Sequence, residues 1–397
     1  MEFGADFDAL IQRFSPDSTA PIAIAVSGGR DSTALMHLTA DRAKQLKRDV
    51  LVLTLDHRLR PEAAAEAMFV AKQAAHLGLA HKTLVWGTPR PSQAAARTAR
   101  HTALAEAAQA AGASVLLMGH TRDDCIETAL MRKRRQQKPV DLIGPWMAAP
   151  SPVWPQGRGV TVLRPLIHTP RGALTQFLRR RRVAWIDDPS NLKHSAERVR
   201  VRRVLARSKA LGVSIAPRLA RLERAAYDQR LHRAERLMDP AFVTIEASGL
   251  IQVSDAALDG RDGAVVLQDL LRLASGRASG PSVGRLKAFL GEDRTTGSRE
   301  TLGGAWLQRG AGGWQIGRDP RHPAMQLGTI WDGRYAKHQH HTPGDQDALK
   351  NARPPAPLPF LLRKSGPPEG PWREIISERL SHLIRIYQTP LLTPVQR

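Results

Sequence analysis

Short apolar segments that alternate with helical segments constrain the fold of this chain more than any other feature. Residues 21–26 (PIAIAV) form an apolar run that stops at Ser27-Gly28-Gly29, and helical spacing resumes at 33–38. Such alternation is typical of a parallel sheet with helices on both faces. We therefore predict an α/β fold with a doubly wound, mostly parallel sheet. Its further elements are predicted as strands at 50–55, 82–86 and 114–118 and helices at 61–77 and 93–111.

The rest of the chain has a weaker pattern. Residues 136–159 are interrupted by proline and glycine, which predicts an irregular crossover or lid, and helical spacing returns at 171–182 and 216–237. The last 56 residues hold ten of the 28 prolines, which predicts a tail that is partly extended or disordered. We expect a first domain at 1–212, a linker helix at 213–240, a smaller C-terminal domain at 241–335 and a Pro-rich tail at 336–397.

The hexapeptide Ser27-Gly28-Gly29-Arg30-Asp31-Ser32 follows the first predicted strand and opens a helix. Its glycines let backbone N–H groups approach an anion, and the helix N-terminus attracts negative charge. The segment matches neither the Walker A pattern nor the dinucleotide-binding G-x-G-x-x-G pattern. It indicates a phosphate-binding loop, and the alternative is an ordinary strand-to-helix turn.

This hexapeptide has the form S-G-G-x-D-S and resembles the signature of the PP-loop ATP pyrophosphatases. Further segments resemble, in the same order, motifs of the tRNA(Ile)-lysidine synthases within that family. His101 stands where those motifs usually have Tyr, Val199 stands where they have Asn, and Gln136-Gln137-Lys138 replaces a glycine-containing segment. The matching segments are LDHRLRP at 55–61, ARTARH at 96–101, GHTRDDCIET at 119–128, RPL at 164–166, DPSN at 188–191 and RVRVR at 198–202.

The resemblance covers residues 21 to about 207 and implies a ligase. Such an enzyme joins free L-lysine to C2 of the wobble cytidine of tRNA(Ile) with a CAU anticodon. It passes through an adenylated cytidine and yields lysidine, AMP and pyrophosphate. The implied cofactors are ATP and Mg²⁺, and residues 241–335 are implied to recognise tRNA. The implied ATP-binding residues are Ser27, Gly28, Gly29, Arg30, Asp31, Ser32, His57, Arg97, Arg100, Gly119 and His120.

Carboxylates follow the fourth predicted strand at helical spacing. Asp123, Asp124 and Glu127 are three and four residues apart, so two of them share one helical face. Magnesium binds a few carboxylates together with substrate phosphates and water. We therefore predict Asp31, Asp124 and Glu127 as catalytic residues and metal ligands. The alternative is an acidic helix start that is stabilised by the helix dipole or by pairing with Arg132 and Arg134.

Other polar residues fall at the predicted carboxyl ends of the strands, where ligands of such sheets bind. His57 and His120 are suited to stack on adenine or to donate to a phosphate, although a lone histidine is often structural. Arg97 and Arg100 lie three residues apart, a spacing suited to phosphate or pyrophosphate. Their alternative is a solvated helix face.

Positive charge indicates a polyanionic partner. The net charge is +22, and residues 171–207 contain ten arginines and one lysine against three carboxylates. The run Arg179–Arg182 beside Trp185 fits contact with an RNA backbone and stacking on a base. The alternative is a solvated helix end. The residues predicted to bind tRNA are Arg179, Arg180, Arg181, Arg182, Arg198, Arg200 and Arg202.

Several function classes are disfavoured. The single cysteine, Cys125, excludes a disulfide within the chain and argues against a tRNA thiolase or a glutamine-dependent amidotransferase. A different PP-loop tRNA-modifying enzyme and a non-catalytic RNA-binding protein remain as alternatives, but the second does not explain the loop with its downstream carboxylates. No run approaches 18 apolar residues and no signal peptide is recognisable, so we expect a cytoplasmic protein without membrane contact.

Overall fold

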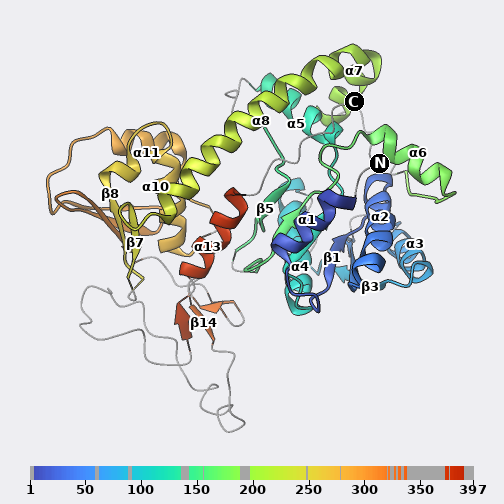
Figure 1. The fold of residues 1–397 in the computed structure, drawn as a ribbon, viewed down its shortest axis with the longest axis horizontal. Coiled ribbons are helices and arrows are strands. Elements are labelled where there is room, and N and C mark those ends of the chain that lie inside the picture. Colours follow the sequence, from blue (N-terminus) through green and yellow to red (C-terminus); the bar gives the residue numbers. More distant parts are fainter. Residues whose placement is uncertain are drawn as a thin grey trace, which may run out of the picture. The chain divides into compact units, whose positions relative to one another are not determined.

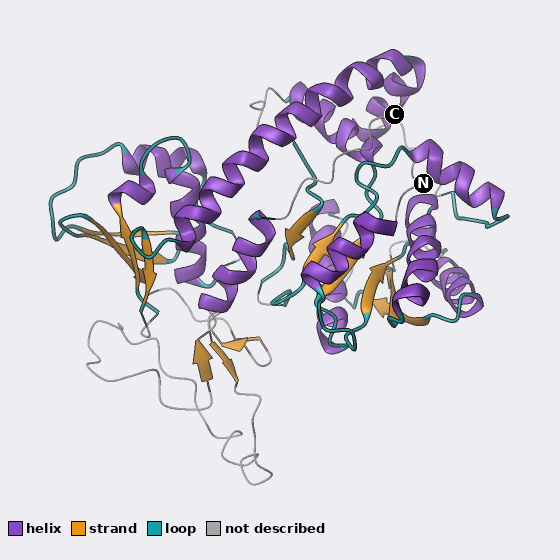
Figure 2. Cartoon of the chain, in the orientation of Figure 1, coloured by secondary structure: helices purple, strands orange, loops and turns teal. Residues whose placement is uncertain are grey.

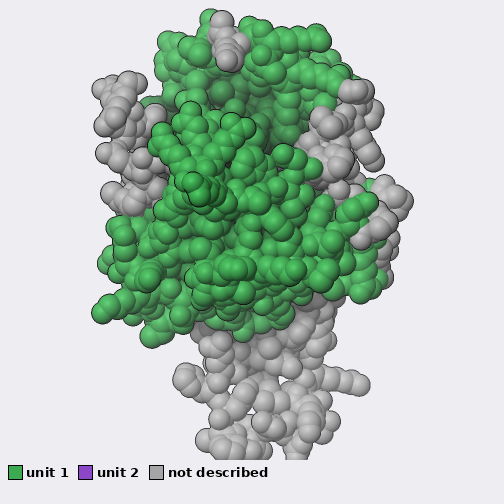
Figure 3. Space-filling view, turned by 90° about the vertical axis from the view of Figure 1, so that its right-hand side faces the viewer, with its two compact units in different colours: residues 1–153, 159–227, 389–397 green, residues 154–158, 228–388 purple. Residues whose placement is uncertain are grey.

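The computed structural model divides the chain into two compact units. Unit 1 holds the residues up to Val153 and those from Gly159 to Tyr227, and Figure 3 shows its surface as one packed body. Unit 2 holds Trp154–Arg158 and Asp228–Gln388. The structure describes residues 4–58, 62–87, 92–135, 143–154, 156–187, 197–246, 249–277, 279–319, 321, 326–327, 330–331, 335–337, 372–374 and 376–388.

A six-stranded sheet forms the centre of unit 1, in the order β3-β2-β1-β4-β6-β5. Ile24 pairs with Val52 on one side and with Leu117 on the other, both in parallel register. This confirms the predicted doubly wound, mostly parallel sheet. The strands are β1 (Ile22–Ala25), β2 (Val50–Asp56), β3 (Ala80–Val85), β4 (Val115–Met118), β5 (Ala148–Pro150) and β6 (Thr161–Leu163).

Helices cover the sheet because each parallel connection must cross over it. α2 (Arg30–Leu46) and α3 (Ala63–His76) connect successive strands on one side, and α4 (Gln93–Ala110) returns on the other (Figure 1). Leu104 and Ala108 of α4 pack with Leu53 in a buried cluster. Strands β1 to β3 are added toward one edge of the sheet and β4 toward the other, so the strand order switches between the parallel neighbours β1 and β4. Their carboxyl ends therefore flank the crevice where α/β sheets bind ligands.

Further helices accompany the sheet, and Figure 2 shows helices in purple. α5 packs against α7, and α2 packs against α6. Part of the segment predicted as an irregular crossover forms β5, which pairs antiparallel with β6; residues 136–142 of that segment lie outside the described part. The helices are α1 (Gly4–Phe14), α5 (Arg122–Arg134), α6 (Arg171–Arg180), α7 (Glu197–Arg207) and α8 (Lys209–Met238).

Unit 2 is built on a five-stranded antiparallel sheet in the order β7-β8-β11-β10-β9. α10 lies on this sheet, and Leu267, Leu270 and Leu271 of α10 are buried in the core beside Ile316 of β11. The elements are β7 (Val243–Ile245), β8 (Ile251–Ser254), α9 (Asp255–Leu258), α10 (Gly263–Ser275), α11 (Val283–Leu290), β9 (Arg299–Leu302), β10 (Ala305–Arg309), β11 (Gly313–Arg318) and α13 (Ile376–Tyr387).

The division between the units falls inside α8, between Tyr227 and Asp228, whereas we placed the domain boundary near residue 212. The predicted Pro-rich tail includes ordered elements: β14 (Tyr335–Lys337) and β15 (Trp372–Glu374) pair, and α13 joins the core of unit 2. A smaller sheet combines these strands with β12 (Gln326–Leu327) and β13 (Ile330–Trp331). Within the described part, no helix is long and apolar enough to cross a membrane.

Candidate active site

The predicted phosphate-binding loop joins β1 to α2 at the carboxyl edge of the sheet. Gly28 has a φ of +79°, and a Cβ built there would lie 2.5 Å from Cδ1 of Ile186. A side chain at this position is therefore excluded both by backbone conformation and by space. The Ser32 hydroxyl donates to the Gly29 carbonyl at 3.0 Å and accepts from the Ser27 N–H at 3.2 Å, which ties the loop to the first turn of the helix.

The end of β4 lies directly against this loop. A Cβ at Gly119 would lie 3.0 Å from the backbone nitrogen of Ser32. Glycine at this position lets the two strand ends approach each other. The loop and the Gly119-His120 corner thereby form two walls of one crevice.

A cleft of about 510 Å³ occupies this crevice. The predicted ATP-binding residues line it, except Gly28. Among the described residues, six arginines and four carboxylates line the cleft, so its wall carries net positive charge. The residues that were predicted to bind ATP and that line the cleft are Ser27, Gly29, Arg30, Asp31, Ser32, His57, Arg97, Arg100, Gly119 and His120. The other charged residues that line it are Glu66, Asp124, Arg171, Asp187, Arg198 and Arg202.

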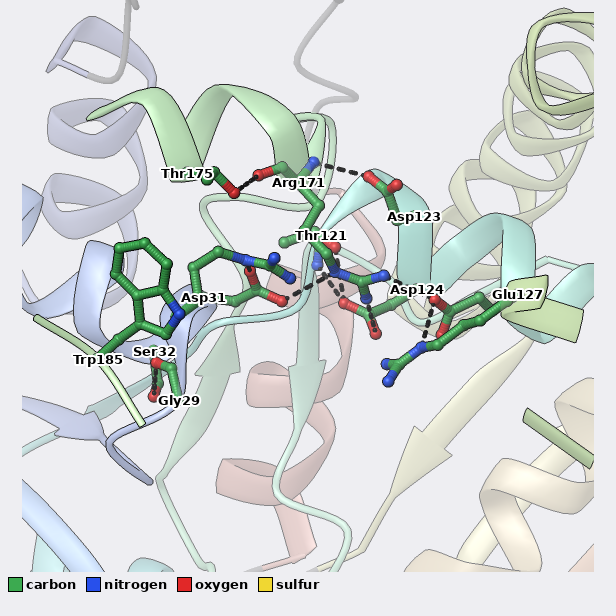
Figure 4. A network of polar contacts seen from close by, with 12 residues as sticks. Gly29, Asp31, Ser32, Thr121, Asp123, Asp124, Glu127, Arg171, Thr175 and Trp185 are labelled. Atoms are coloured by element: carbon green, nitrogen blue, oxygen red, sulfur yellow. Dashed lines mark hydrogen bonds and ion pairs between the residues drawn. The ribbon is translucent and has the colours of Figure 1, made fainter. Parts of the chain in front are cut away.

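Arg171, the first residue of α6, lies at the centre of the acidic residues (Figure 4). Its guanidinium nitrogens lie 3.1 Å from Oδ2 of Asp31, 3.2 Å from Oδ1 of Asp124 and 2.7 Å from Oε1 of Glu127. Its backbone N–H donates to Asp123 at 2.7 Å. One arginine thus joins the loop after β1 to the helix after β4.

Two more arginines reach the same carboxylates from α7. Arg198 Nε lies 2.7 Å from Oε2 of Glu127, and its Nη2 lies 2.8 Å from Oδ1 of Asp124. Arg202 Nε lies 2.8 Å from Oε1 of Glu127. Arg198 and Arg202 are four residues apart and therefore share the face of α7 that packs on α5.

Two carboxylates of this network, Asp124 and Glu127, have pKa values below their usual range. Burial raises the pKa of Asp124, but Arg171, hydrogen bonds from Thr121 and Arg198 outweigh burial and lower it. Burial likewise opposes ionisation of Glu127, and the hydrogen bond from Arg202 and the charge of Arg171 shift its pKa below the usual range. Burial disfavours the charged form of Arg171, but Glu127 and Asp124 raise its pKa.

Asp123 and Asp124 also shape the start of α5. Asp124 accepts hydrogen bonds from the backbone and hydroxyl of Thr121, both at 2.8 Å, and forms a capping box. Arg132, one of the arginines considered as a partner for these carboxylates, donates to the Ile143 carbonyl at 2.6 Å. Asp124 therefore combines a capping role with a place on the cleft wall.

His120 is neutral. Burial lowers its pKa, and the positive charge of Arg164 lowers it further. Arg164 Nε donates to Nδ1 of His120 at 3.3 Å, so the proton of the neutral ring is on Nε2. The Nε2–H group is then available as a donor, and contact of His120 with a nucleotide stays a prediction. His57 lines the cleft from the end of β2.

The arginines predicted to bind tRNA separate into two groups. Arg179–Arg182 are exposed at the end of α6, and Arg181 is paired with Asp41 at 2.6 Å. Arg200 is exposed on α7, whereas Arg198 and Arg202 line the cleft and bind the acidic residues. Trp185 donates to Asp187 at 3.0 Å. The sequence did not predict that α7 carries both an exposed arginine, Arg200, and two arginines that line the cleft.

Sequence reasoning also missed Arg171 and Ile186. Arg171 lies in a segment rich in arginine, so nothing local distinguishes it, and its role depends on partners 44 to 140 residues away. Ile186 follows Trp185 in the chain and pairs with the loop through its N–H, which donates to the Gly28 carbonyl at 2.9 Å. Motif residues 59–61, 136–138 and 188–191 lie outside the described part.

The three predicted magnesium ligands are all paired with arginines. Asp31, Asp124 and Glu127 each bind at least one arginine, and Glu127 is 1% exposed. In the described part of the chain, no group of three or more His, Cys, Asp or Glu side chains is arranged to hold a metal ion. The carboxylates thus have arginine partners in this structure, and their binding of Mg²⁺ together with ATP phosphates stays a prediction.

Comparisons with known proteins agree with the site. Residues 4–209 match the PP-loop domain family. The tRNA(Ile)-lysidine synthase of Mesorhizobium japonicum is 38% identical over 335 residues, which cover 80% of this chain and 72% of that protein. The tRNA(Ile)-lysidine synthase of Hyphomonas neptunium is 38% identical over 288 residues, or 72% of this chain and 77% of that protein. The tRNA(Ile)-lysidine synthase of Caulobacter vibrioides is 42% identical over 212 residues, which cover 53% of this chain and 51% of that protein.

Proposed function

The chain belongs to the tRNA(Ile)-lysidine synthase family, and on that premise we propose that it ligates free L-lysine to C2 of the wobble cytidine of tRNA(Ile) with a CAU anticodon. Its PP-loop domain uses ATP. The single observation that supports this proposal best is the positively charged cleft, which combines the loop after β1 with the arginines of α6 and α7.

The proposed reaction has two steps. In the first, O2 of the cytidine attacks the α-phosphorus of ATP, an O–P bond forms, and the bond to the β-phosphate breaks to release pyrophosphate. In the second, the lysine ε-nitrogen attacks C2, and the C2–O2 bond breaks so that AMP leaves with that oxygen. The amine must lose a proton, which a nearby base or water accepts.

The chain's own residues supply binding and electrostatic stabilisation to these steps. The loop at Ser27–Ser32 and the N-terminus of α2 would hold phosphate oxygens. Arg97 and Arg100, on the cleft wall from α4, would offset charge that develops on the phosphates. His57 and the neutral His120 would contact the adenosine part or a phosphate through neutral hydrogen bonds or stacking.

Magnesium remains part of the proposal as a companion of the ATP phosphates, which are its usual ligands in nucleotide sites. Asp31 and Asp124 are the predicted carboxylates on the cleft wall. Because both are paired with Arg171 here, we assign no step to the metal.

The proposed tRNA surface is the exposed run Arg179–Arg182, with Arg200 on α7. Exposed guanidinium groups are suited to phosphate contacts that position an RNA without reading its bases. Recognition of tRNA by residues 241–335 is likewise proposed from the family.

Nucleoside mass spectrometry tests this function. The full chain is incubated with tRNA(Ile), ATP and lysine, and the tRNA is digested and analysed for lysidine. We expect lysidine together with equimolar AMP and pyrophosphate, and none of these products without ATP. Without lysine, we expect neither lysidine nor AMP, and at most the one pyrophosphate per tRNA that the first step releases. Sulfur incorporation would favour a PP-loop thiolase, and tRNA binding without any AMP release would favour a non-catalytic RNA-binding protein.

A further inference from the structure

Glu127 occupies an unusual position for a residue predicted to hold a metal. Its side chain is 1% exposed and lies behind the cleft wall, whereas its three arginine partners line the cleft. A metal ligand must direct an oxygen lone pair toward the ligand space. The oxygens of Glu127 instead accept three hydrogen bonds from arginines.

The nitrogen atoms through which the arginines bind Glu127 fix the positions of their guanidinium groups. Arg198 and Arg202 both bind Glu127 through Nε, the nitrogen nearest the side-chain stem. Arg171 binds it through Nη1. Contacts at Oε1 and Oε2 together fix three guanidinium groups that come from two different helices. Without a carboxylate between them, these like charges would repel one another in a partly dry site.

The wall that these arginines form belongs to the same cleft as the phosphate-binding loop. Arg171, Arg198 and Arg202 line it together with Ser27, Gly29 and Ser32. Arginine presents a planar, permanently charged donor group that matches phosphate oxygens. An anion of phosphate chemistry is therefore the ligand that this wall fits.

We propose that Glu127 is a positioning residue that holds Arg171, Arg198 and Arg202 as a binding group for the β- and γ-phosphates of ATP and for the pyrophosphate product. This inference rests on the proposed ATP-dependent function. It changes the role of Glu127 from metal ligand to arginine anchor, and it assigns Arg198 and Arg202 to the nucleotide instead of the tRNA.

Calorimetric binding of inorganic pyrophosphate to the full chain tests the proposal, first in EDTA and then with Mg²⁺. Glu127→Gln keeps the size of the side chain but replaces one acceptor oxygen with an amide that repels arginine donors. We expect pyrophosphate affinity to fall about tenfold or more in EDTA, which corresponds to about 1.4 kcal/mol. Glu127→Asp, which keeps the charge, should restore part of the loss.

The matched control is Glu223→Gln. Glu223 is another partly buried carboxylate of unit 1, and burial raises its pKa, but it does not line the cleft. We expect its pyrophosphate affinity to equal that of the unmodified protein. Affinity for tRNA should stay within about twofold in both variants, because the proposal separates the arginine group from the RNA surface.

Loss of a buried ionic partner can prevent folding, so a second pair of variants is needed. Arg202→Gln leaves two arginines on Glu127, and Arg207→Gln removes an exposed arginine of the same helix. We expect the first to weaken pyrophosphate binding in EDTA and the second to leave it unchanged.

Three outcomes would overturn the proposal. An effect of Glu127→Gln that is seen with Mg²⁺ and vanishes in EDTA would make Glu127 a metal ligand. Equal affinities in the Arg202 and Arg207 variants would remove the arginines from the phosphate site. Weaker tRNA binding with normal pyrophosphate binding would show that these arginines bind RNA and not the nucleotide. A protein that makes no lysidine but shows the expected pyrophosphate pattern would refute the proposed function and leave this inference intact.

Discussion

His101 offers a quantitative test of how the helix behind the cleft is stabilised. The residue lies in α4, its side chain is 3% exposed, and neither ring nitrogen has a hydrogen-bond partner within the described part of the chain. Burial lowers its pKa from 6.5 to about 4, with further lowering by Arg100, Arg97 and Arg164. The native protein therefore keeps this ring neutral where an unfolded chain would protonate it.

The sign and size of the effect follow from this difference. As the pH falls from about 6.5 to about 4, the unfolded state binds a proton that the native state does not, so the free energy of unfolding falls. Each pH unit in this window costs about 1.4 kcal/mol, so the loss at about pH 5 is ~2 kcal/mol. Below the folded pKa both states bind the proton and the loss stops growing.

His101→Leu replaces the ring with an apolar side chain of similar size and should remove this loss. Urea unfolding is followed by far-ultraviolet circular dichroism from neutral pH to about pH 4. We expect the variant to equal or exceed the unmodified protein near neutral pH, because a buried unpaired polar group costs about 1–3 kcal/mol. We expect its advantage to grow by ~2 kcal/mol at about pH 5.

The comparison controls for other groups. Partly buried histidines with lowered pKa values, such as His37 and His168, are present in both proteins, so their contributions cancel in the difference. His76→Gln, at an exposed position of α3, should show no pH-dependent difference. Parallel stability curves for the unmodified protein and His101→Leu would refute the reasoning, because they would mean that the ring is solvated or hydrogen-bonded in the native state.

Three further predictions concern the site. Asp31→Ala should reduce ATP-dependent pyrophosphate release about 10²-fold or more, since it removes an acidic partner of Arg171 at the loop. Its affinity for tRNA should be nearly unchanged. Normal pyrophosphate release would contradict this prediction. Gly28→Ala should weaken ATP binding measured by calorimetry, because its Cβ meets Ile186 and its φ is positive; wild-type affinity would show that the loop adapts. Replacing three arginines of Arg179–Arg182 with Ala should weaken tRNA binding. The slope of log K against log salt concentration should become shallower by somewhat less than one unit per lost phosphate contact. Normal tRNA binding with weak ATP binding would show that these arginines bind the nucleotide.

Much of unit 1 could be predicted from local sequence. Apolar strands followed by glycine or polar corners are local patterns, and β1, β2 and β4 occur where the periodicity placed them. The strand β5, within the segment predicted as an irregular crossover, could not be predicted from sequence. It has only three residues and little periodicity of its own, and it is defined by its pairing with β6. The smaller sheet of unit 2 likewise depends on pairing between β14 and β15, which are separated by residues outside the described part.

The sequence by itself determined that a glycine-containing loop joins β1 to a helix and that carboxylates open the helix after β4. Spacing of three and four residues dictates which of these carboxylates share a helical face. It could not determine what those carboxylates face. Glu127 and Arg198 are 71 residues apart and Arg171 and Asp31 are 140 residues apart, and they meet because α5, α6 and α7 pack beside the loop. Tertiary packing therefore decided that arginines, drawn by charge into a partly buried site, became the partners of the predicted metal ligands.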